Sequence, residues 1–215
     1  MTLENIELFS GLPEAQLLRL AEQARQRTYP AGTVIVNEGD EAHGMFIINS
    51  GALKVFVTEE NGKEVTLSLL GEDDYFGELA LVDDAPRSAS VMTLERSTLM
   101  QISRNDFNDV IATNPACLQI ILRNLVGRIR ELTDNVRALA LIDVFGRISR
   151  IFDSMAEPEG ELRIIRRRMT QQDLANLVGA SREMVNRILR ELVAGDYIEI
   201  HHQYILLKRK LPARW

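Results

Sequence analysis

Residues 170–192 read TQQDLANLVGASREMVNRILREL, and this stretch predicts how the C-terminal part of the chain folds. Thr170, followed three residues later by Asp173, is typical of a capped helix start. Apolar residues then recur on one face of this first helix: Leu174, Leu177 and Val178. Gly179 is expected to end the helix, because a sharp turn favours a residue without a Cβ atom.

A second helix is predicted directly after this turn, with Ser181 as its N-terminal cap. Its spacing predicts a core-facing set of Met184, Val185, Ile188, Leu189 and Leu192. The outward set is Arg182, Glu183, Asn186, Arg187 and Arg190. Two helices joined by a short glycine turn form the helix-turn-helix arrangement, whose second helix enters the major groove of DNA N-terminus first.

The outward residues of the second helix suit the reading of base edges. Arg182 and Arg187 can each donate two hydrogen bonds to guanine, and Glu183 can accept one from cytosine. Each such contact discriminates between bases by roughly 1–3 kcal/mol. Since phosphates repel a carboxylate, Glu183 indicates base recognition rather than affinity alone. The alternative is a surface Glu183–Arg187 ion pair, worth only about 0.3–0.5 kcal/mol.

The charge distribution supports a polyanionic partner for this part only. Residues 144–215 hold 13 Lys and Arg against 9 Asp and Glu, a net charge of +4 within a chain whose total is −6. The remaining residues are therefore acidic. A basic segment of this kind is expected on a nucleic-acid-binding domain. Thr170 and Ser181 are candidate phosphate contacts, because hydroxyls at helix starts often bind phosphate.

The N-terminal half has a different pattern. Residues 14–27 are predicted to be helical, and short alternating runs then follow from residue 28 to residue 103. Turn signals separate these runs, including Asn61-Gly62, which favours a tight hairpin. Many short strands at this spacing predict an antiparallel barrel or jelly roll.

A heptad seam lies between the two halves. Apolar residues recur in alternating steps of four and three: Leu118, Leu122, Leu125, Ile129, Leu132, Val136 and Leu139. Three heptads with both core positions apolar predict a parallel two-helix dimer interface. The alternative is a helix that packs on its own domain. Further on, the sequence predicts a helix over 144–156, a loop over 156–161, a strand after it, and a C-terminal hairpin over 196–207.

Residues 75–91, YFGELALVDDAPRSASV, indicate an anion site in the predicted barrel. Gly77 permits a close approach, and the four residues after it are expected to form one helical turn with free N–H groups. Arg87 and the Ser88 hydroxyl would complete a phosphate site. Glu78 does not suit a phosphate but does suit a ribose hydroxyl, so the set fits a ribose cyclic phosphate.

Alternatives remain open from these residues alone. The segment could be a structural turn in which Arg87 makes a surface ion pair with Asp83 or Asp84. The protein would then be a constitutive DNA-binding regulator with a structural barrel. A third class, an enzyme on a cupin-like jelly roll, needs clustered metal ligands, and His43 is the only histidine in the predicted barrel. We therefore expect neither an enzyme nor a bound metal.

The sequence 178–192 resembles the recognition helix of the cyclic-AMP receptor protein/FNR family of bacterial transcription regulators. The pattern Ser-Arg-Glu-x-Val-x-Arg at 181–187 is similar to that of its cyclic-AMP receptor branch. The resemblance covers nearly the whole chain and implies an α+β protein: a jelly-roll effector domain at 1–113, a dimerisation helix and hinge at 114–143, and a winged helix-turn-helix at 144–215.

The same resemblance assigns candidate DNA contacts. By it, Arg182, Glu183 and Arg187 read a TGTGA-like half-site in double-stranded DNA, and the hairpin at 196–207 forms the wing. Asn186 departs from the small residue usual in the family and is expected to add or alter a contact. The family also implies RNA polymerase as a partner. His201 and His202 at the tip of the hairpin are interpreted as turn residues.

The resemblance also assigns an effector site. It implies that Gly77, Glu78, Leu79, Ala80, Arg87 and Ser88 hold the ribose phosphate of a cyclic nucleotide, with cyclic AMP favoured. In the family, a Thr-Ser pair on the dimer helix contacts adenine. This chain has Leu132-Thr133, so Thr133 keeps a hydroxyl and Leu132 loses the polar contact. Cyclic GMP, cyclic di-GMP or no ligand therefore remain open.

Other sensing chemistries of the family are disfavoured. An FNR-type iron-sulfur cluster needs several cysteines, and the chain has only Cys117, interpreted as a small residue near a helix start. A haem sensor needs an axial ligand, whereas His43 lies in a predicted loop. With no apolar run near 20 residues and no signal-peptide pattern, we expect a cytoplasmic protein without a membrane partner.

Overall fold

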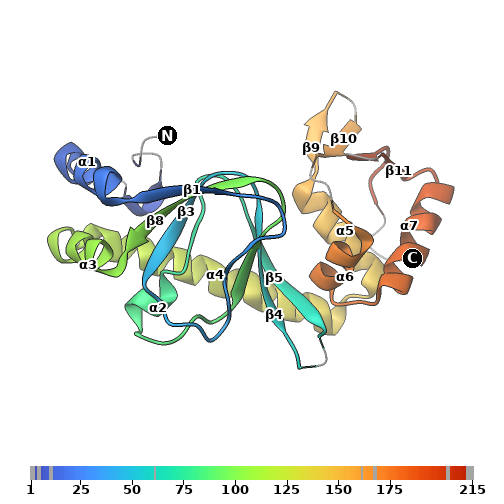
Figure 1. Ribbon diagram of the computed structural model, residues 1–215. Helices are drawn as coiled ribbons and strands as arrows, with labels where there is room; N and C mark the ends of the chain where they lie inside the picture. The colour runs from blue at the N-terminus through green and yellow to red at the C-terminus, as the bar shows by residue number, and fades with distance from the viewer. Residues whose placement is uncertain are drawn as a thin grey trace. The chain divides into compact units, whose positions relative to one another are not determined.

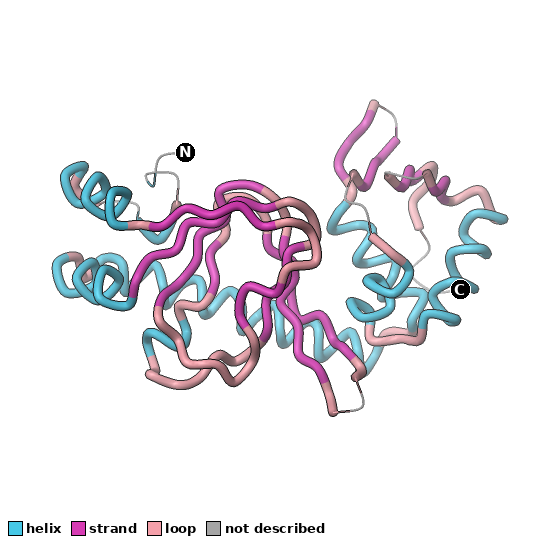
Figure 2. The backbone as a smooth tube through the Cα atoms, in the orientation of Figure 1, coloured by secondary structure: helices cyan, strands magenta, loops and turns pink. Residues whose placement is uncertain are grey.

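The computed structural model describes residues 3, 6–9, 12–60, 62–160, 162–166, 169–201 and 204–211. The chain divides into two compact units, Met1–Ile129 and Arg130–Trp215. Most strands belong to the first unit, and a smaller sheet with three helices makes up most of the second (Figures 1 and 2). One long helix, α4 (Ala116–Leu141), contributes residues to both units.

The N-terminal unit is a β jelly roll with short helices at its ends. Its other elements, in chain order, are η2 (Glu7–Phe9), α1 (Glu14–Gln23), β1 (Arg25–Tyr29), β2 (Val34–Val36), β3 (Gly44–Ser50), β4 (Leu53–Thr58), β5 (Glu64–Leu70), β6 (Tyr75–Phe76), α2 (Leu79–Val82), β7 (Ser90–Thr93), β8 (Ser97–Ser103) and α3 (Arg104–Thr113). The strands form two antiparallel sheets, ordered β1-β8-β3-β6 and β2-β7-β4-β5. The predicted barrel is therefore confirmed.

Alternating apolar residues of both sheets pack into one core, as the strand pattern predicts. Its buried members are Val36, Phe46, Ile48, Leu53, Leu70, Phe76, Val91 and Leu99. Phe46 on β3 and Phe76 on β6 stack with ring centroids 5.1 Å apart, which fixes β6 directly before the candidate anion site. The predicted turn at 61–62 has Gly62 at φ +81°, while Asn61 lies outside the described residues.

The predicted helix over 14–27 is too long. It ends at Gln23, and Arg25–Tyr29 is instead strand β1, paired with β8. Residues 25–29 form a strand despite their local helical pattern, because they pair with β8, some 70 residues away. Leu17 and Leu20 of α1 are buried in a second core shared with α3 and the start of α4. Cys117 is buried in the same core, and burial raises the pKa of its thiol.

The C-terminal unit is a winged helix-turn-helix. Its elements are α5 (Val144–Met155), β9 (Glu157–Glu159), β10 (Leu162–Ile165), α6 (Gln171–Val178), α7 (Arg182–Ala194), β11 (Ile198–Ile200) and β12 (Ile205–Leu207). The sheet order is β11-β12-β10-β9, so the predicted C-terminal hairpin is part of a four-stranded sheet. The loop predicted at 156–161 is wrong in part, because β9 pairs there with β10. His202 lies outside the described residues.

Helix α4 presents two different faces. Cys117 and Ile121 are buried in the N-terminal unit, and Leu125 packs partly against them. Six of the seven predicted seam residues are instead 41–66% exposed: Leu118, Leu122, Ile129, Leu132, Val136 and Leu139. Within the seam, the alternative of a helix packed on its own domain fits Leu125, which packs against the N-terminal core.

No single helix in the described part of the chain is long and apolar enough to cross a membrane. Helices α3 and α4, bent by 111°, pass such a test only when taken together, by length and composition.

Candidate functional site

The candidate anion site begins at a backbone conformation that needs glycine. Gly77 has φ +85°, and a Cβ atom there would lie 2.4 Å from Nη1 of Arg87. The next residue, Glu78, precedes the single helical turn α2 and accepts backbone hydrogen bonds from Leu81 and Val82. The predicted helical turn is confirmed. Its tight contact with an arginine explains why the chain has glycine at this position.

Arg87 is buried beneath this turn, with 6% of its surface exposed. Its Nη1 donates to the carbonyl of Gly77 at 2.7 Å, and its Nη2 donates to that of Gly44 at 2.6 Å. Burial lowers the pKa of Arg87, against the opposing effect of the Glu78 carboxylate. The alternative of a surface Arg87–aspartate pair is wrong: Asp84 pairs with Arg104 instead.

Glu78 is 2% exposed, and its two carboxylate oxygens have different surroundings. Oε1 accepts a hydrogen bond from Nη1 of Arg128 on α4 at 2.5 Å, whereas Oε2 has no partner in the structure. Burial is the largest influence on this group and raises the pKa of Glu78, with Arg128 opposing it. A buried acceptor without a donor is rare and costs about 1–3 kcal/mol, so a ligand hydroxyl would satisfy it.

Arg128 is a site residue that the sequence analysis missed. Its Nη2 also donates to the carbonyl of Tyr75 at 3.2 Å, and its guanidinium lies 5.7 Å from the centre of the Tyr75 ring. The sequence did contain a signal for this residue. Its helical spacing places Arg128 after Ile121 and Leu125, on the face of α4 that packs against the barrel. An arginine on such a face indicates a buried partner.

The remaining predicted effector residues occupy distinct places. Ala80 is buried, Leu79 is half-buried and Ser88 is exposed just after Arg87. Thr133 lies exposed on α4, within the C-terminal unit. Its role in contacting a ligand stays a prediction. In the described part of the chain, no three His, Cys, Asp or Glu side chains gather as a metal site would require.

The helix-turn-helix has the caps predicted from the sequence. The side chain of Thr170 accepts from the N–H of Asp173, and that carboxylate accepts from the N–H of Thr170, which completes a capping box. Gly179 adopts φ +63° at the turn, and Ser181 caps α7 by accepting from the N–H of Met184 at 3.2 Å. These bonds satisfy backbone donors that would otherwise lack partners, and so fix where α6 and α7 begin.

The predicted base-reading side chains project from the start of α7. Arg182, Glu183 and Arg187 are all exposed. Arg187 lies 3.9 Å from the Glu191 carboxylate, so the alternative Glu183–Arg187 pair is not the one that forms. The backbone N–H of Glu183 itself, and then the Ser181 side chain, lower the pKa of Glu183 and favour its charged form. A charged carboxylate can accept from a cytosine amino group.

Asn186 differs from its predicted outward position. It is half-buried, and its Oδ1 accepts a hydrogen bond from Nε2 of Gln171 on α6 at 3.3 Å. The side chain thus joins the two helices of the motif. Its amide group is held in one orientation, which the one-dimensional spacing on α7 did not indicate.

The chain is similar to known proteins over most of its length. Residues 26–114 match the family model of the cyclic nucleotide-binding domain, and residues 146–211 match that of the Crp-like helix-turn-helix domain. A CRP-like cAMP-activated global transcriptional regulator from Mycobacterium tuberculosis is 29% identical over 204 residues, covering 93% of this chain and 91% of the relative.

Two further similarities agree with this. The cAMP-activated global transcriptional regulator CRP of Salmonella typhimurium is 31% identical over 187 residues, covering 83% of this chain and 87% of that protein. The structure of the c-di-GMP responsive global regulator CLP of Xanthomonas campestris has a TM-score of 0.78 at 25% identity, covering 91% of this chain and 99% of that one. On the strength of both matched domains and these relatives, the chain belongs to the cyclic-AMP receptor protein/FNR family of transcription regulators.

Proposed function

We propose that this protein is a homodimeric transcription regulator, gated by a cyclic nucleotide, that binds a palindromic TGTGA-like DNA site. The surroundings of Glu78 are the main support for gating by a nucleotide. One oxygen of its buried carboxylate is bound to Arg128 and the other has no partner, and the carboxylate interacts with the charge on Arg87. A hydroxyl donor and a phosphate on one ligand would engage both groups. A ribose cyclic phosphate supplies both at short range.

Cyclic AMP is the favoured effector. The relatives from Mycobacterium tuberculosis and Salmonella typhimurium are both named as cAMP-activated. The second candidate is cyclic di-GMP, because the Xanthomonas campestris protein is described as responsive to that dinucleotide. Leu132 in place of a polar residue also weakens the case for adenine selectivity, and it leaves cyclic GMP as a third arm of the test.

The DNA contact is proposed to be the first two turns of α7. Arg182 and Arg187 would donate to guanine, and Glu183 would accept from cytosine. Ser181 and Thr170, both at helix starts, would lie near phosphates. Asn186, held by Gln171, would adjust the preferred base at one position of the half-site.

The dimer is proposed to form along the exposed seam of α4. Leu122, Ile129 and Val136 are each more than 60% exposed in the single chain, and an apolar stripe of this length is expected to be covered. A two-fold dimer would present two α7 helices about 34 Å apart, one turn of DNA. The effector would favour the arrangement competent for DNA. The family further implies contact with RNA polymerase, and we expect the protein to act in the cytoplasm.

The test is DNA binding at one fixed salt concentration to a duplex with TGTGA and TCACA arms separated by six base pairs. Binding is compared without ligand and with cyclic AMP, cyclic GMP or cyclic di-GMP, for the wild type and Arg87→Ala. Arg19→Ala is the matched control, because Arg19 is an exposed arginine of the same unit. We expect one nucleotide to tighten binding in the wild type and the control but not in Arg87→Ala.

Tight binding that ignores every nucleotide and the Arg87→Ala change would overturn gating and leave a constitutive regulator. Absence of sequence-specific binding under all conditions would overturn the TGTGA-like half-site. In that case Asn186→Gly, which restores a small residue, is the variant to test next on the same duplex.

A further inference from the structure

Two arginines bind one short segment at the start of β3. The three consecutive residues Ala42, His43 and Gly44 all use their carbonyls as acceptors. Arg87 donates to Gly44, as described above. Arg104 donates from its backbone N–H to His43 at 3.0 Å, and from Nε and Nη2 to Ala42 at 3.3 and 3.0 Å. The segment is therefore held by hydrogen bonds from both arginines.

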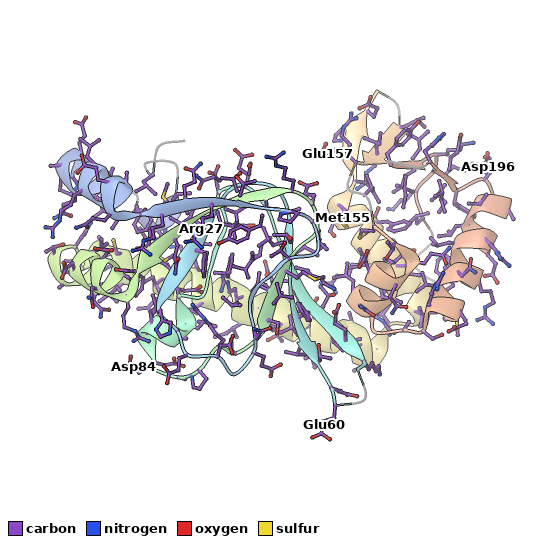
Figure 3. The ribbon with its side chains drawn as sticks, viewed as in Figure 1. Arg27, Glu60, Asp84, Met155, Glu157 and Asp196 are labelled. Carbon is purple, nitrogen blue, oxygen red and sulfur yellow. The ribbon has the colours of Figure 1, made fainter. Side chains whose placement is uncertain are left out.

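The same two arginines also bind the candidate anion site, at opposite ends. Arg87 holds Gly77, where the site begins. Arg104 donates from Nη2 to the carbonyl of Ala80 in α2 at 3.0 Å and pairs through Nη1 with Asp84 in the loop that follows. Asp84 lies beyond α2 at the edge of the N-terminal unit (Figure 3). The stretch from Gly77 to Asp84, which we name the cradle, is thus attached to residues 42–44 at two points.

We propose that Arg104 is a positioning residue for effector binding, which holds the cradle in shape while Arg87 engages the ligand phosphate. This inference rests on the proposed function, and it concerns a residue outside the predicted site. Arg104 itself does not reach for the ligand, because its donors are directed to Ala42, Ala80 and Asp84.

A second arginine is needed because the ligand phosphate and the carbonyls of the barrel would compete for the N–H donors of Arg87. Its two terminal nitrogens bind the carbonyls of Gly77 and Gly44, and a phosphate would draw on those same nitrogens. Those carbonyl bonds would weaken if the guanidinium turned toward a ligand. The attachment by Arg104 does not depend on the ligand and so persists. A planar guanidinium can bind several acceptors in fixed directions, whereas a lysine ammonium provides only a point charge.

Electrostatics agree with this placement. The charge on Arg104 helps to lower the pKa of Arg87, so the two cations lie close enough to interact. Asp84 lies next to Arg104 and compensates its charge, although the Asp84 side chain is 82% exposed. The hydrogen bonds from Arg104 to the backbone carbonyls of Ala42 and Ala80 are partly buried. They should therefore contribute most to holding the cradle in position.

The expected consequence of losing Arg104 is a smaller fraction of molecules whose cradle has the shape that binds the ligand. If loss of Arg104 leaves the cradle correctly shaped only part of the time, the apparent dissociation constant rises by the inverse of that fraction. We expect Arg104→Gln to weaken binding about tenfold, the order found when groups that orient metal ligands are removed. The association rate should fall and the dissociation rate should stay near that of the wild type, because the bound contacts are unchanged.

The experiment uses the full chain in four variants: Arg104→Gln, Arg104→Lys, Asp84→Asn and the control Arg19→Gln, an exposed arginine on α1 paired with Asp109. Hydrogen exchange without ligand follows the amides of Leu81, Val82 and Asp83, which are bonded within the cradle. Stopped-flow binding of fluorescent cyclic AMP, cyclic GMP and cyclic di-GMP gives both rates.

Arg104→Gln is expected to speed exchange at these three amides and slow association. Arg104→Lys should recover only part of both effects, and the control none of them. Asp84→Asn should have a small effect, because asparagine still accepts a hydrogen bond and tolerates the positive φ of +55° found there. An effect of Asp84→Asn as large as that of Arg104→Gln would overturn the role given to the two carbonyls.

Unchanged exchange and unchanged rates in Arg104→Gln would overturn the inference. Faster exchange throughout the β3–β8 ladder would overturn it as well, since Arg104 would then support the whole unit rather than the cradle. If the wild type binds none of the three nucleotides, the proposed function fails, and the exchange measurement alone decides whether Arg104 positions the cradle.

Discussion

At the scale of single residues, the candidate effector site depends on a few atoms. Glu78 has one oxygen bound to Arg128 and one that is buried without a donor. Arg87 lies so close to Gly77 that only glycine fits there. A site with an unsatisfied acceptor beside a buried cation is prepared for a ligand that has both a hydroxyl and a negative charge.

We expect Gly77→Ala to abolish most effector binding. Its Cβ atom would meet Nη1 of Arg87 at 2.4 Å, so the guanidinium must move away from the site. Gly32→Ala is the control: Gly32 has a similar φ of +77°, but its Cβ atom would meet nothing within 4 Å. Each change should cost about 1–2 kcal/mol in unfolding free energy from backbone strain. Calorimetric titration with the effector should show a loss of affinity for the Gly77 variant only; equal losses would contradict the close approach.

The ionisation of Glu78 should affect stability in a predictable direction. Burial raises the pKa of Glu78 above its ordinary value of 4.5, so the folded protein binds this proton more tightly than the unfolded chain does. Ionisation therefore lowers the unfolding free energy as pH rises from 4.5 through the raised pKa. Glu78→Gln lacks this titration. Urea denaturation across that range should show the wild type losing stability relative to the variant with rising pH, and a constant difference would refute the prediction.

At the scale of elements, α4 has two faces with different surroundings. Its inner residues Cys117 and Ile121 belong to the core of the N-terminal unit, so the helix cannot detach without opening that core. Its outer seam remains exposed. Covering one large apolar side chain contributes roughly 1.5–3 kcal/mol, so a paired seam of this length would stabilise a dimer substantially.

Leu122→Glu should therefore convert the protein to a monomer. Leu122 is 61% exposed at the proposed seam, and a charge there would be buried against the same charge on a second copy. Leu18→Glu is the matched control, because Leu18 is 59% exposed and belongs to α1 rather than to the seam. Sedimentation velocity should show a monomer for the first variant and a dimer for the second. A dimer in both would place the interface elsewhere.

At the scale of the whole molecule, charge is divided along the chain. Residues 144–215 are net positive by 4 while the entire chain is net negative by 6. The labelled Asp196, in the turn after α7, is one of the acidic residues of the C-terminal unit (Figure 3). It pairs with Lys208 and Arg209, and these partners lower the pKa of Asp196. A basic DNA-binding part joined to an acidic remainder favours one orientation of approach to DNA.

A two-fold dimer should depend on the spacing of its half-sites. Inserting about five base pairs, half a turn, between the two TGTGA-like arms would rotate them to opposite faces of the duplex. We expect binding to fall to the level of a duplex with one arm replaced. Fluorescence anisotropy with the three duplexes at one salt concentration measures this. Equal affinity for the original and the expanded site would mean that the two arms are not bound together.

Local sequence determined much of this protein. The capping box of Thr170 and Asp173, the turn at Gly179 and the apolar face of α7 were all predicted and confirmed, because each depends on residues within one or two turns of each other. The strands of the barrel followed from alternation and turn residues in the same way. The seam of α4 was likewise a matter of periodicity along one helix.

Tertiary structure decided the rest. Strands β1 and β9 exist because β8 and β10 provide partners, which no local pattern indicates. Arg128 meets Glu78 across 50 residues, and Arg104 meets Ala42 across 62. Such contacts depend on how the barrel closes. Closure removes these charged groups from water, and burial of a charge is costly unless it then has a partner. The sequence thus determined which elements form, whereas packing decided which side chains surround the candidate site.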